Sequence, residues 1–339
     1  MTAKLAWAAL ALAPLAVAVR FAVSEPAVVF PIAAAALMPL AWLVSRATEE
    51  AGHHTGPAIG GLLNATFGNV PELFVALFAV AAGLHDVVRG SLTGSIVGNL
   101  LLVLGLTLLV GGRGECERRP LLESLALVGL AVPLFAVAAL PHFLEHDRDG
   151  AVAAYTVPVA LALLAVYAVV TVLEVRSELA KHERGEPAEW SLRRALIVLA
   201  AAMVATALVS ETITGSIGDF AETTGLSEFF VSAVVVALAG NAAEHGAAVV
   251  AAAHGELELG TDVALESTAQ VAAFVVPAVA LLSFAIEPLP LAFSVGELAV
   301  LAGAVALAAL AVAHGHVTRA RGAALVAGYL GAVAVFWFV

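Results

Sequence analysis

The sequence predicts an all-α integral membrane protein with about eleven transmembrane helices, arranged as two five-helix repeats of inverted topology after an extra N-terminal helix. Three observations support this fold class. The 339 residues are 62% apolar and 12% charged, with a mean hydropathy of +1.01, whereas soluble domains are about half apolar and a quarter charged. The apolar residues form separate runs long enough to cross a bilayer. A polar motif occurs twice, in runs that cross the membrane in opposite directions.

Eleven apolar runs are each close to the roughly 20 residues that a spanning helix requires. In chain order they are 4–23, 27–46, 57–84, 87–111, 121–140, 151–175, 192–214, 228–254, 261–285, 291–313 and 321–339. The first run lies between Lys4 and Arg20 and resembles a secretory signal, but the ten spans behind it favour a retained helix. The mixed-charge segment "EVRSELAKHERGEPAEW" between the halves is expected to be a solvated or interfacial connector.

The breaks between these runs are rich in Pro, Gly or charged residues. Pro and Gly interrupt helices, and charged residues avoid the bilayer interior. The breaks contain Glu25-Pro26, Gly56, His85-Asp86, the segments 112–120, 141–150 and 176–191, then Gly215, Gly255, Pro288 and the segment 314–320.

The basic residues predict the orientation in the membrane. With eleven spans, 12 of the 15 Lys and Arg lie on the side of the N-terminus, and only Arg20, Arg89 and Arg148 lie on the other. Basic loops remain in the cytoplasm, so we expect a cell-membrane protein with a cytoplasmic N-terminus and an external C-terminus. The net charge of −12 comes without a basic patch, which argues against nucleic acid as a partner. The lone Cys116 excludes an intramolecular disulfide framework and a cysteine metal site.

Two copies of one motif lie 172 residues apart, in "GNVPEL" and "GNAAEH". They share Gly, Asn and Glu at equal spacing, as Gly68, Asn69 and Glu72 and as Gly240, Asn241 and Glu244. Ser95 and Ser267 keep the same offset. Five spans separate the copies, so the second enters the membrane from the opposite side, as in secondary transporters whose site lies at the midplane. The chain then divides into an extra helix (1–25), a first repeat (26–176), a cytoplasmic linker (177–190) and a second repeat (191–339).

The candidate site is built from oxygen atoms. Its predicted members are Glu72, Glu244, Asn69, Asn241, Gly68, Gly240, Ser95, Ser267, Asn99 and Gln270. Asn and Glu three residues apart share a helix face, and intramembrane carboxylates are functional candidates by default. Carboxylate, amide, carbonyl and hydroxyl oxygens suit Ca²⁺, whereas zinc or copper would call for His or Cys.

Two facing carboxylates suggest how transport is coupled. Ionised Glu72 and Glu244 repel each other in a poorly hydrated site, and either one Ca²⁺ or protons on both relieve that repulsion. Competition for the same oxygens is a sufficient basis for antiport. We therefore expect Ca²⁺ and H⁺ as substrates, a lipid bilayer as surroundings, no cofactor and no enzymatic activity, and the sequence leaves a homo-oligomer open.

Four stretches carry a resemblance to a known family: "GGLLNATFGNVPEL", "GSIVGNLLLVLG", "GNAAEH" and "STAQVAAFVVP". They resemble the two conserved repeats of the Ca²⁺/H⁺ antiporter (CAX) family within the calcium/cation exchanger superfamily. The resemblance implies eleven spans, Glu72 and Glu244 as the essential ion-binding carboxylates, and export of Ca²⁺ against H⁺ by alternating access. This chain departs from the family at Val70-Pro71, at Gly98, and at Glu266, where Gly is more usual.

Other functions stay as alternatives. The first is exchange of Na⁺ for Ca²⁺, or of Mn²⁺ or another cation for H⁺, although the neutral Gln270 favours protons over sodium. A passive channel is the second. An intramembrane enzyme would call for HExxH or paired DxxxD motifs, which the sequence lacks. The sequence leaves His245 between proton relay and helix packing, places Glu266 near the cytoplasmic mouth, and assigns Glu211 and Glu297 no role beyond reaching the membrane interface.

Overall fold

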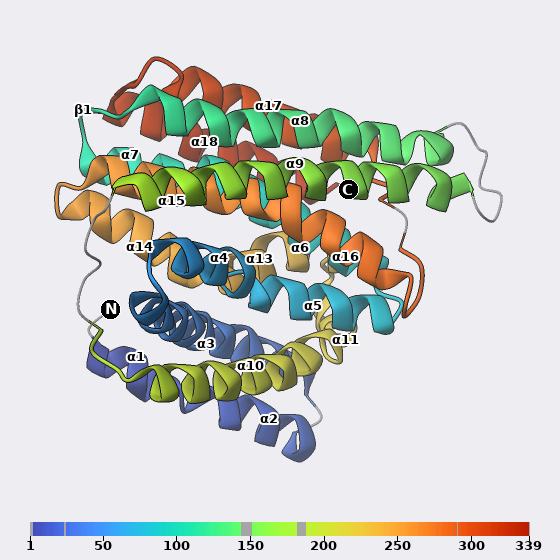
Figure 1. Ribbon diagram of the computed structural model, residues 1–339. Coiled ribbons are helices and arrows are strands. Elements are labelled where there is room, and N and C mark those ends of the chain that lie inside the picture. The colour runs from blue at the N-terminus through green and yellow to red at the C-terminus, as the bar shows by residue number, and fades with distance from the viewer. Residues whose placement is uncertain (1–2, 24, 144–150, 182–187, 290, 339) are drawn as a thin grey trace.

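The computed structural model describes residues 3–23, 25–143, 151–181, 188–289 and 291–338 (Figure 1). Most of its long helices run side by side along one direction. Within these residues, ten helices are long and apolar enough to cross a membrane, or eleven if one bent pair counts as a span. The prediction of an all-α membrane fold with about eleven spans is confirmed.

The first half begins with α1 (Ala3–Ala9) and α2 (Leu12–Ala22), followed by the long α3 (Pro26–Thr55). Two shorter helices, α4 (Pro57–Phe67) and α5 (Val70–Ala81), make up the next span. The following span consists of α6 (His85–Val97), the π-helical turn η1 (Gly98–Val103) and α7 (Leu104–Gly111). The last two helices are α8 (Arg118–Phe143) and α9 (Ala151–Lys181).

The second half repeats this order. It contains α10 (Leu192–Thr214), α11 (Ile217–Thr224), α12 (Glu228–Val231), π-helical η2 (Ser232–Val236), α13 (Ala237–Gly240), α14 (Ala242–Ala253), α15 (Leu257–Gln270), π-helical η3 (Val271–Val275), α16 (Val276–Ser283), α17 (Val295–Val312) and α18 (Arg319–Phe336). The broken span α4–α5 corresponds to α12–η2–α13–α14, and η1 corresponds to η3 at the same offset. A two-residue strand in each half, β1 (Gly114–Glu115) and β2 (His316–Val317), pairs antiparallel and ties the halves together.

Two local features differ from the sequence-based expectation. Helix α3 continues nine residues past its predicted end at residue 46, because Arg46 and Glu50 form an ion pair of 2.7 Å one turn apart. It stops at Gly56, whose φ of 86° only glycine adopts readily. The short α11 was not predicted as a separate helix, and it meets the α12–α13 segment at 111°.

The repeats present two opposite ends, which we name by the helices that begin there. The α4/α15 end contains the starts of α4 and α15 and the β1–β2 pair, and the α6/α12 end contains the starts of α6 and α12. These two names are used below.

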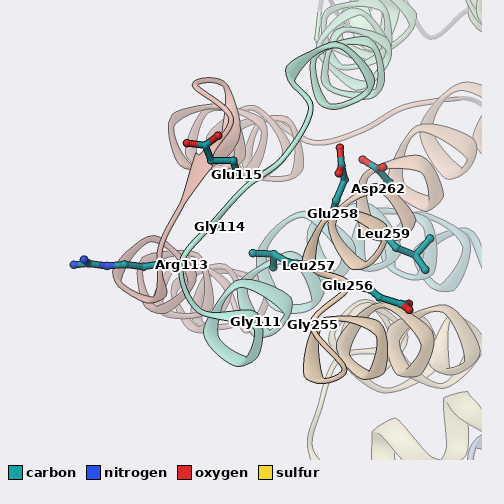
Figure 2. A pocket seen from close by; sticks show the side chains of 10 residues that line it. All are labelled: Gly111, Arg113, Gly114, Glu115, Gly255, Glu256, Leu257, Glu258, Leu259 and Asp262. Atoms are coloured by element: carbon teal, nitrogen blue, oxygen red, sulfur yellow. The ribbon is translucent and has the colours of Figure 1, made fainter.

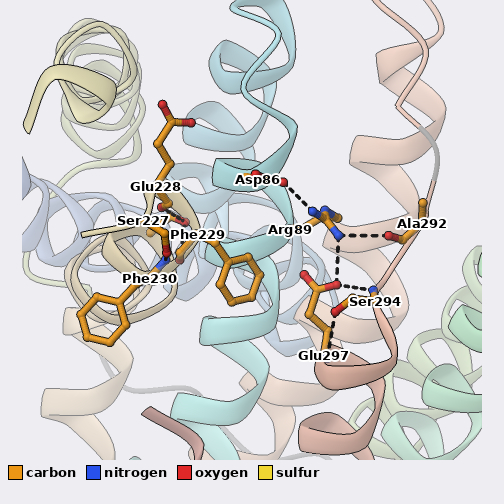
Figure 3. Close-up of polar contacts among 10 residues, drawn as sticks. Asp86, Arg89, Ser227, Glu228, Phe229, Phe230, Ala292, Ser294 and Glu297 are labelled. Atoms are coloured by element: carbon orange, nitrogen blue, oxygen red, sulfur yellow. Dashed lines mark hydrogen bonds and ion pairs between the residues drawn. The ribbon is translucent and has the colours of Figure 1, made fainter. Parts of the chain in front are cut away.

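A buried ion pair holds the α6/α12 end together (Figure 3). Arg89 on α6 donates to the Glu297 carboxylate at 3.1 Å, to the Ala292 carbonyl at 3.1 Å and to Asp86 at 2.5 Å. Glu297 is 0% exposed and closes a capping box with Ser294 at the start of α17. Glu297 is therefore a structural residue that does not reach the interface. Glu211 also forms an ion pair, with Arg20 at 3.1 Å.

Candidate functional site

Two helix breaks form the centre of the site. Asn69 separates α4 from α5 with φ −94° and ψ 16°, and Asn241 separates α13 from α14 with φ −86° and ψ 9°. Pro71 lies in the first turn of α5, where its missing N–H costs nothing. The second break has the same geometry with Ala242-Ala243 and no proline. The break therefore comes with the Gly-Asn sequence shared by both motifs, and Val70-Pro71 is compatible with it.

The breaks bring the two glutamates next to the opposite motif. A Cβ atom placed on Gly240 would lie 2.9 Å from Oε1 of Glu72. A Cβ atom placed on Gly68 would lie 3.6 Å from Oε1 of Glu244. Gly240 thus makes room for the carboxylate of the other repeat, whereas a side chain at Gly68 would collide with the Asn64 carbonyl at 2.7 Å and only touch Glu244. The two acidic helix starts, at α5 and α14, are also where negative charge is favoured.

The predicted amides bind across the repeats. Asn69 Nδ2 donates to Oε1 of Gln270 at 2.8 Å, and Asn241 Nδ2 donates to the Ser95 hydroxyl at 2.9 Å and to the Ala237 carbonyl at 2.9 Å. Each asparagine is therefore held by the other repeat. All four of the side chains Asn69, Gln270, Asn241 and Ser95 are buried.

A second chain of hydrogen bonds ends on Glu244. Asn99 Nδ2 donates to Oγ of Ser267 at 2.9 Å, and Ser267 in turn donates to Oε2 of Glu244. Oδ1 of Asn99 lies 2.8 Å from Nε2 of His245, so that nitrogen must carry the hydrogen. Every donor points towards the carboxylate. Because the amide of Asn99 interrupts the chain, His245 orients Asn99 and does not pass protons through it.

Three buried oxygen atoms at the centre lack a donor. Among the described residues, Oε2 of Glu72, Oδ1 of Asn69 and Oδ1 of Asn241 have no hydrogen-bond partner. Buried polar atoms are nearly always paired, and an unpaired one costs free energy. All three are acceptors, so they can bind a cation or accept from a donor such as water. No cluster of three or more His, Cys, Asp or Glu occurs in the described part of the chain.

Sequence reasoning missed one residue of this site and left a second unassigned. Asn64 was not singled out, but its Oδ1 would lie 3.5 Å from a Cβ atom placed on Gly68, beside Glu244. Its polar side chain in the apolar run 57–67 was the available signal. Glu266 was left without a role, and its Oε1 accepts from Nε2 of Gln270 at 3.1 Å.

The two approaches to the site differ in packing. At the α6/α12 end, Val231 is 0% exposed, whereas Ile59, at the equivalent place on α4, is 50% exposed. Gly90 and Gly94 on α6 pack so closely on α12 and η2 that a side chain at either would collide with Ser232 or with the Ala233 carbonyl. The site is therefore sealed towards the α6/α12 end.

At the α4/α15 end, the places of Gly90 and Gly94 are taken by Asp262 and Glu266. Glu266 is exposed, and a carboxylate facing lipid at this depth would be costly, so its exposed surface must face water. A cleft of about 610 Å³ lies at the same end, and Figure 2 shows Glu258 and Asp262 projecting the same way from α15 on its wall. The α4/α15 end is thus the less closely packed and more acidic of the two, and it is called the open approach below.

Comparisons with known proteins agree with this fold. The sodium/calcium exchanger protein family matches residues 26–176 and 194–338. The Ca²⁺/H⁺ antiporter ChaA of Bacillus subtilis is 34% identical over 316 residues, which cover 90% of each chain. The structure of native YfkE has a TM-score of 0.84 at 30% identity over 98% of both chains. The H⁺/Ca²⁺ exchanger CAX has a TM-score of 0.77 at 15% identity over 99% of this chain and 92% of that one, a likeness of fold alone.

Proposed function

Because the chain belongs to the sodium/calcium exchanger protein family, we propose that it is a secondary antiporter that exports Ca²⁺ from the cytoplasm in exchange for H⁺. The observation that carries this proposal is the set of three unpaired buried acceptors, on Glu72, Asn69 and Asn241, at the meeting point of the inverted motifs. A hard cation with a flexible, oxygen-only coordination shell fits them. The name of the 34% identical relative, a Ca²⁺/H⁺ antiporter, supports protons as the counter-ion.

The mechanism follows from the charges of the two glutamates. With one Ca²⁺ bound, the two carboxylates are neutralised, with Asn69, Asn241 and the hydroxyls of Ser95 and Ser267 available to complete the coordination. With protons on both, the pair is neutral as well. The bare form leaves two negative charges in a poorly hydrated site and is costly to reorient. Only loaded forms change sides, so each outward Ca²⁺ step is followed by an inward proton step.

The orientation of the chain in the membrane indicates the direction in which this cycle moves Ca²⁺. The basic loops favour an N-terminus in the cytoplasm and a C-terminus outside, which would turn the open α4/α15 end to the cytoplasm. In that orientation, this arrangement of the helices is the one that accepts Ca²⁺ from the cytoplasm. In the cell membrane, the opposite state would require α12 and η2 to separate from α6 while α4 closes on α15.

Flux into proteoliposomes tests the proposal. An imposed pH gradient should drive ⁴⁵Ca²⁺ uptake, and an Na⁺ gradient of equal size should not. Glu72→Gln and Glu244→Gln should each lose uptake by about 100-fold or more, since either leaves one fixed charge for a divalent ion. Glu211→Gln removes a membrane carboxylate outside the site and should stay within about twofold.

Each outcome has a separate meaning. Uptake driven by Na⁺ and not by protons would make the protein a Na⁺/Ca²⁺ exchanger. Uptake that persists with neither gradient would indicate a channel. Full uptake in Glu72→Gln would remove this pair of glutamates from the mechanism.

A further inference from the structure

The two motif asparagines have equivalent places but different anchors. Asn241 is held by Ser95 of the other repeat. By symmetry, Asn69 should be held by Ser267, the counterpart of Ser95. The Ser267 hydroxyl instead donates to Glu244 and accepts from Asn99. Asn69 bonds to Gln270 in its place.

Gln270 supplies that anchor, and Glu266 fixes its orientation. The Gln270 amide presents Oε1 to Asn69 at 2.8 Å and Nε2 to Glu266 at 3.1 Å. An amide can rotate by 180° and exchange its oxygen for its nitrogen, whereas an ionised carboxylate can only accept. Glu266 thus selects the one orientation in which Gln270 can accept from Asn69. That orientation turns the Asn69 nitrogen away from the cation and leaves Oδ1 buried and unpaired.

We infer that Glu266 is a positioning residue that sets the Ca²⁺ affinity of the site by orienting Asn69 through Gln270. This inference rests on the proposed function of the same site. Without Glu266, rotation of Gln270 would present its amide hydrogens to Asn69. Asn69 would then have to rotate too, and its positive amide hydrogens would replace the oxygen that faces the cation.

The first repeat shows why the hydrogen-bonded pair of Glu266 and Gln270 occurs only in the second repeat. The counterparts of Glu266 and Gln270 are Gly94 and Gly98, which have no side chains. Gly94 lies against the Ala233 carbonyl and leaves no space for one. There, the free hydroxyl of Ser95 is sufficient for Asn241. Glu266 and Gln270 therefore replace, in the second repeat, an anchor that Ser267 no longer provides.

Equilibrium binding of ⁴⁵Ca²⁺ to the purified full chain in detergent tests the inference without requiring transport. Glu266→Asp keeps the charge but withdraws the oxygens from Gln270, and it should weaken binding about tenfold to hundredfold, as the loss of a partner behind a ligand does. Glu266→Gln keeps the reach, but its amide can donate as well as accept and no longer selects one orientation of Gln270. It should therefore also weaken binding, by about threefold to tenfold. Asp262→Asn, one turn nearer the rim, removes a charge that has no bond to Gln270 and should stay within about threefold of the unchanged protein.

The opposite order would overturn the inference. If Glu266→Asp binds like the unchanged protein and Glu266→Gln and Asp262→Asn are equally weakened, Glu266 only attracts cations by its charge. A double substitution gives a second measurement: in a Gln270→Met background, Glu266→Asp should have no further effect, and an additive loss would contradict the relay. Absence of Ca²⁺ binding by the unchanged protein would instead contradict the proposed function itself.

Discussion

The two repeats carry the same motif residues at the same spacing, yet they surround them differently. In the first repeat, α6 presents Gly90 and Gly94 to α12 and η2, and the helices touch through their backbones. In the second, α15 presents Asp262 and Glu266, and α4 makes little contact with it among the described residues. A twofold sequence relation thus produces one closed and one open approach. The comparison indicates that the repeat determines which motif residues occur in both halves. The side chains that flank those residues determine how closely each approach is packed.

The largest expected effect is a loss of thermal stability when the ion pair at the closed α6/α12 end is broken. Arg89→Gln removes the cation beside Glu297, which is 0% exposed, and leaves that carboxylate buried without its partner. Such a loss costs about 3 kcal/mol or more. The thermal unfolding midpoint in detergent should fall by roughly 5 °C or more. Arg119→Gln, which breaks an exposed pair with Glu123, should leave the midpoint unchanged, and equal shifts in both variants would contradict a structural seal at Arg89.

The next effect tests the close approach of glycine to the opposite glutamate. Gly240→Ala would place a methyl group 2.9 Å from Oε1 of Glu72 and should displace that carboxylate. The Ca²⁺ concentration for half-maximal uptake should rise about tenfold. Gly246→Ala lies two turns further along the same span, in open space, and is the matched control. An equal change in the two variants would mean that helix propensity, and not the contact with Glu72, is responsible.

The smallest expected effect is a difference in the rate at which a thiol reagent modifies equivalent positions at the two ends of the site. In a Cys116→Ala background, Ile59→Cys and Val231→Cys place one thiol at equivalent positions, 50% and 0% exposed. A charged thiol reagent added in Ca²⁺-free detergent solution should modify Ile59→Cys at least about tenfold faster, because the reagent reacts only where water reaches the thiol. Equal rates would show that both approaches open in solution. A reversal at saturating Ca²⁺ would show directly that the open side changes.

The sequence predicts the helices and the membership of the centre well. Periodicity and Gly or Pro breaks were enough to locate the spans, because a spanning helix must satisfy its own backbone. The constant offset of 172 residues was enough to predict that Asn69 and Asn241 lie on opposite sides of one centre. The structure places the predicted Ser95 and Gln270 as their partners. That these residues bind the ion stays a prediction.

The remaining features depend on contacts that a pattern does not contain. The end of α3 depends on an ion pair between Arg46 and Glu50, and both residues were equally compatible with a solvated helix end. The role of Glu297 depends on Arg89, 208 residues away in the chain. The partner of Glu266 depends on the hydrogen bonds that Gln270 and Ser267 make, and no spacing rule states that Ser267 bonds to Glu244 and Asn99 while Ser95 bonds to Asn241.

The packing of Gly90 and Gly94 also limits how such a protein can diverge after its halves have duplicated. Any residue larger than glycine at these two positions must push α6 away from η2, so changes there are tolerated only together with changes in the partner helix. Position 262 carries no such packing restriction and can accept single substitutions. New charge, and with it new ion preference, can therefore accumulate at the α4/α15 end one mutation at a time, while the packing at the α6/α12 end remains unchanged.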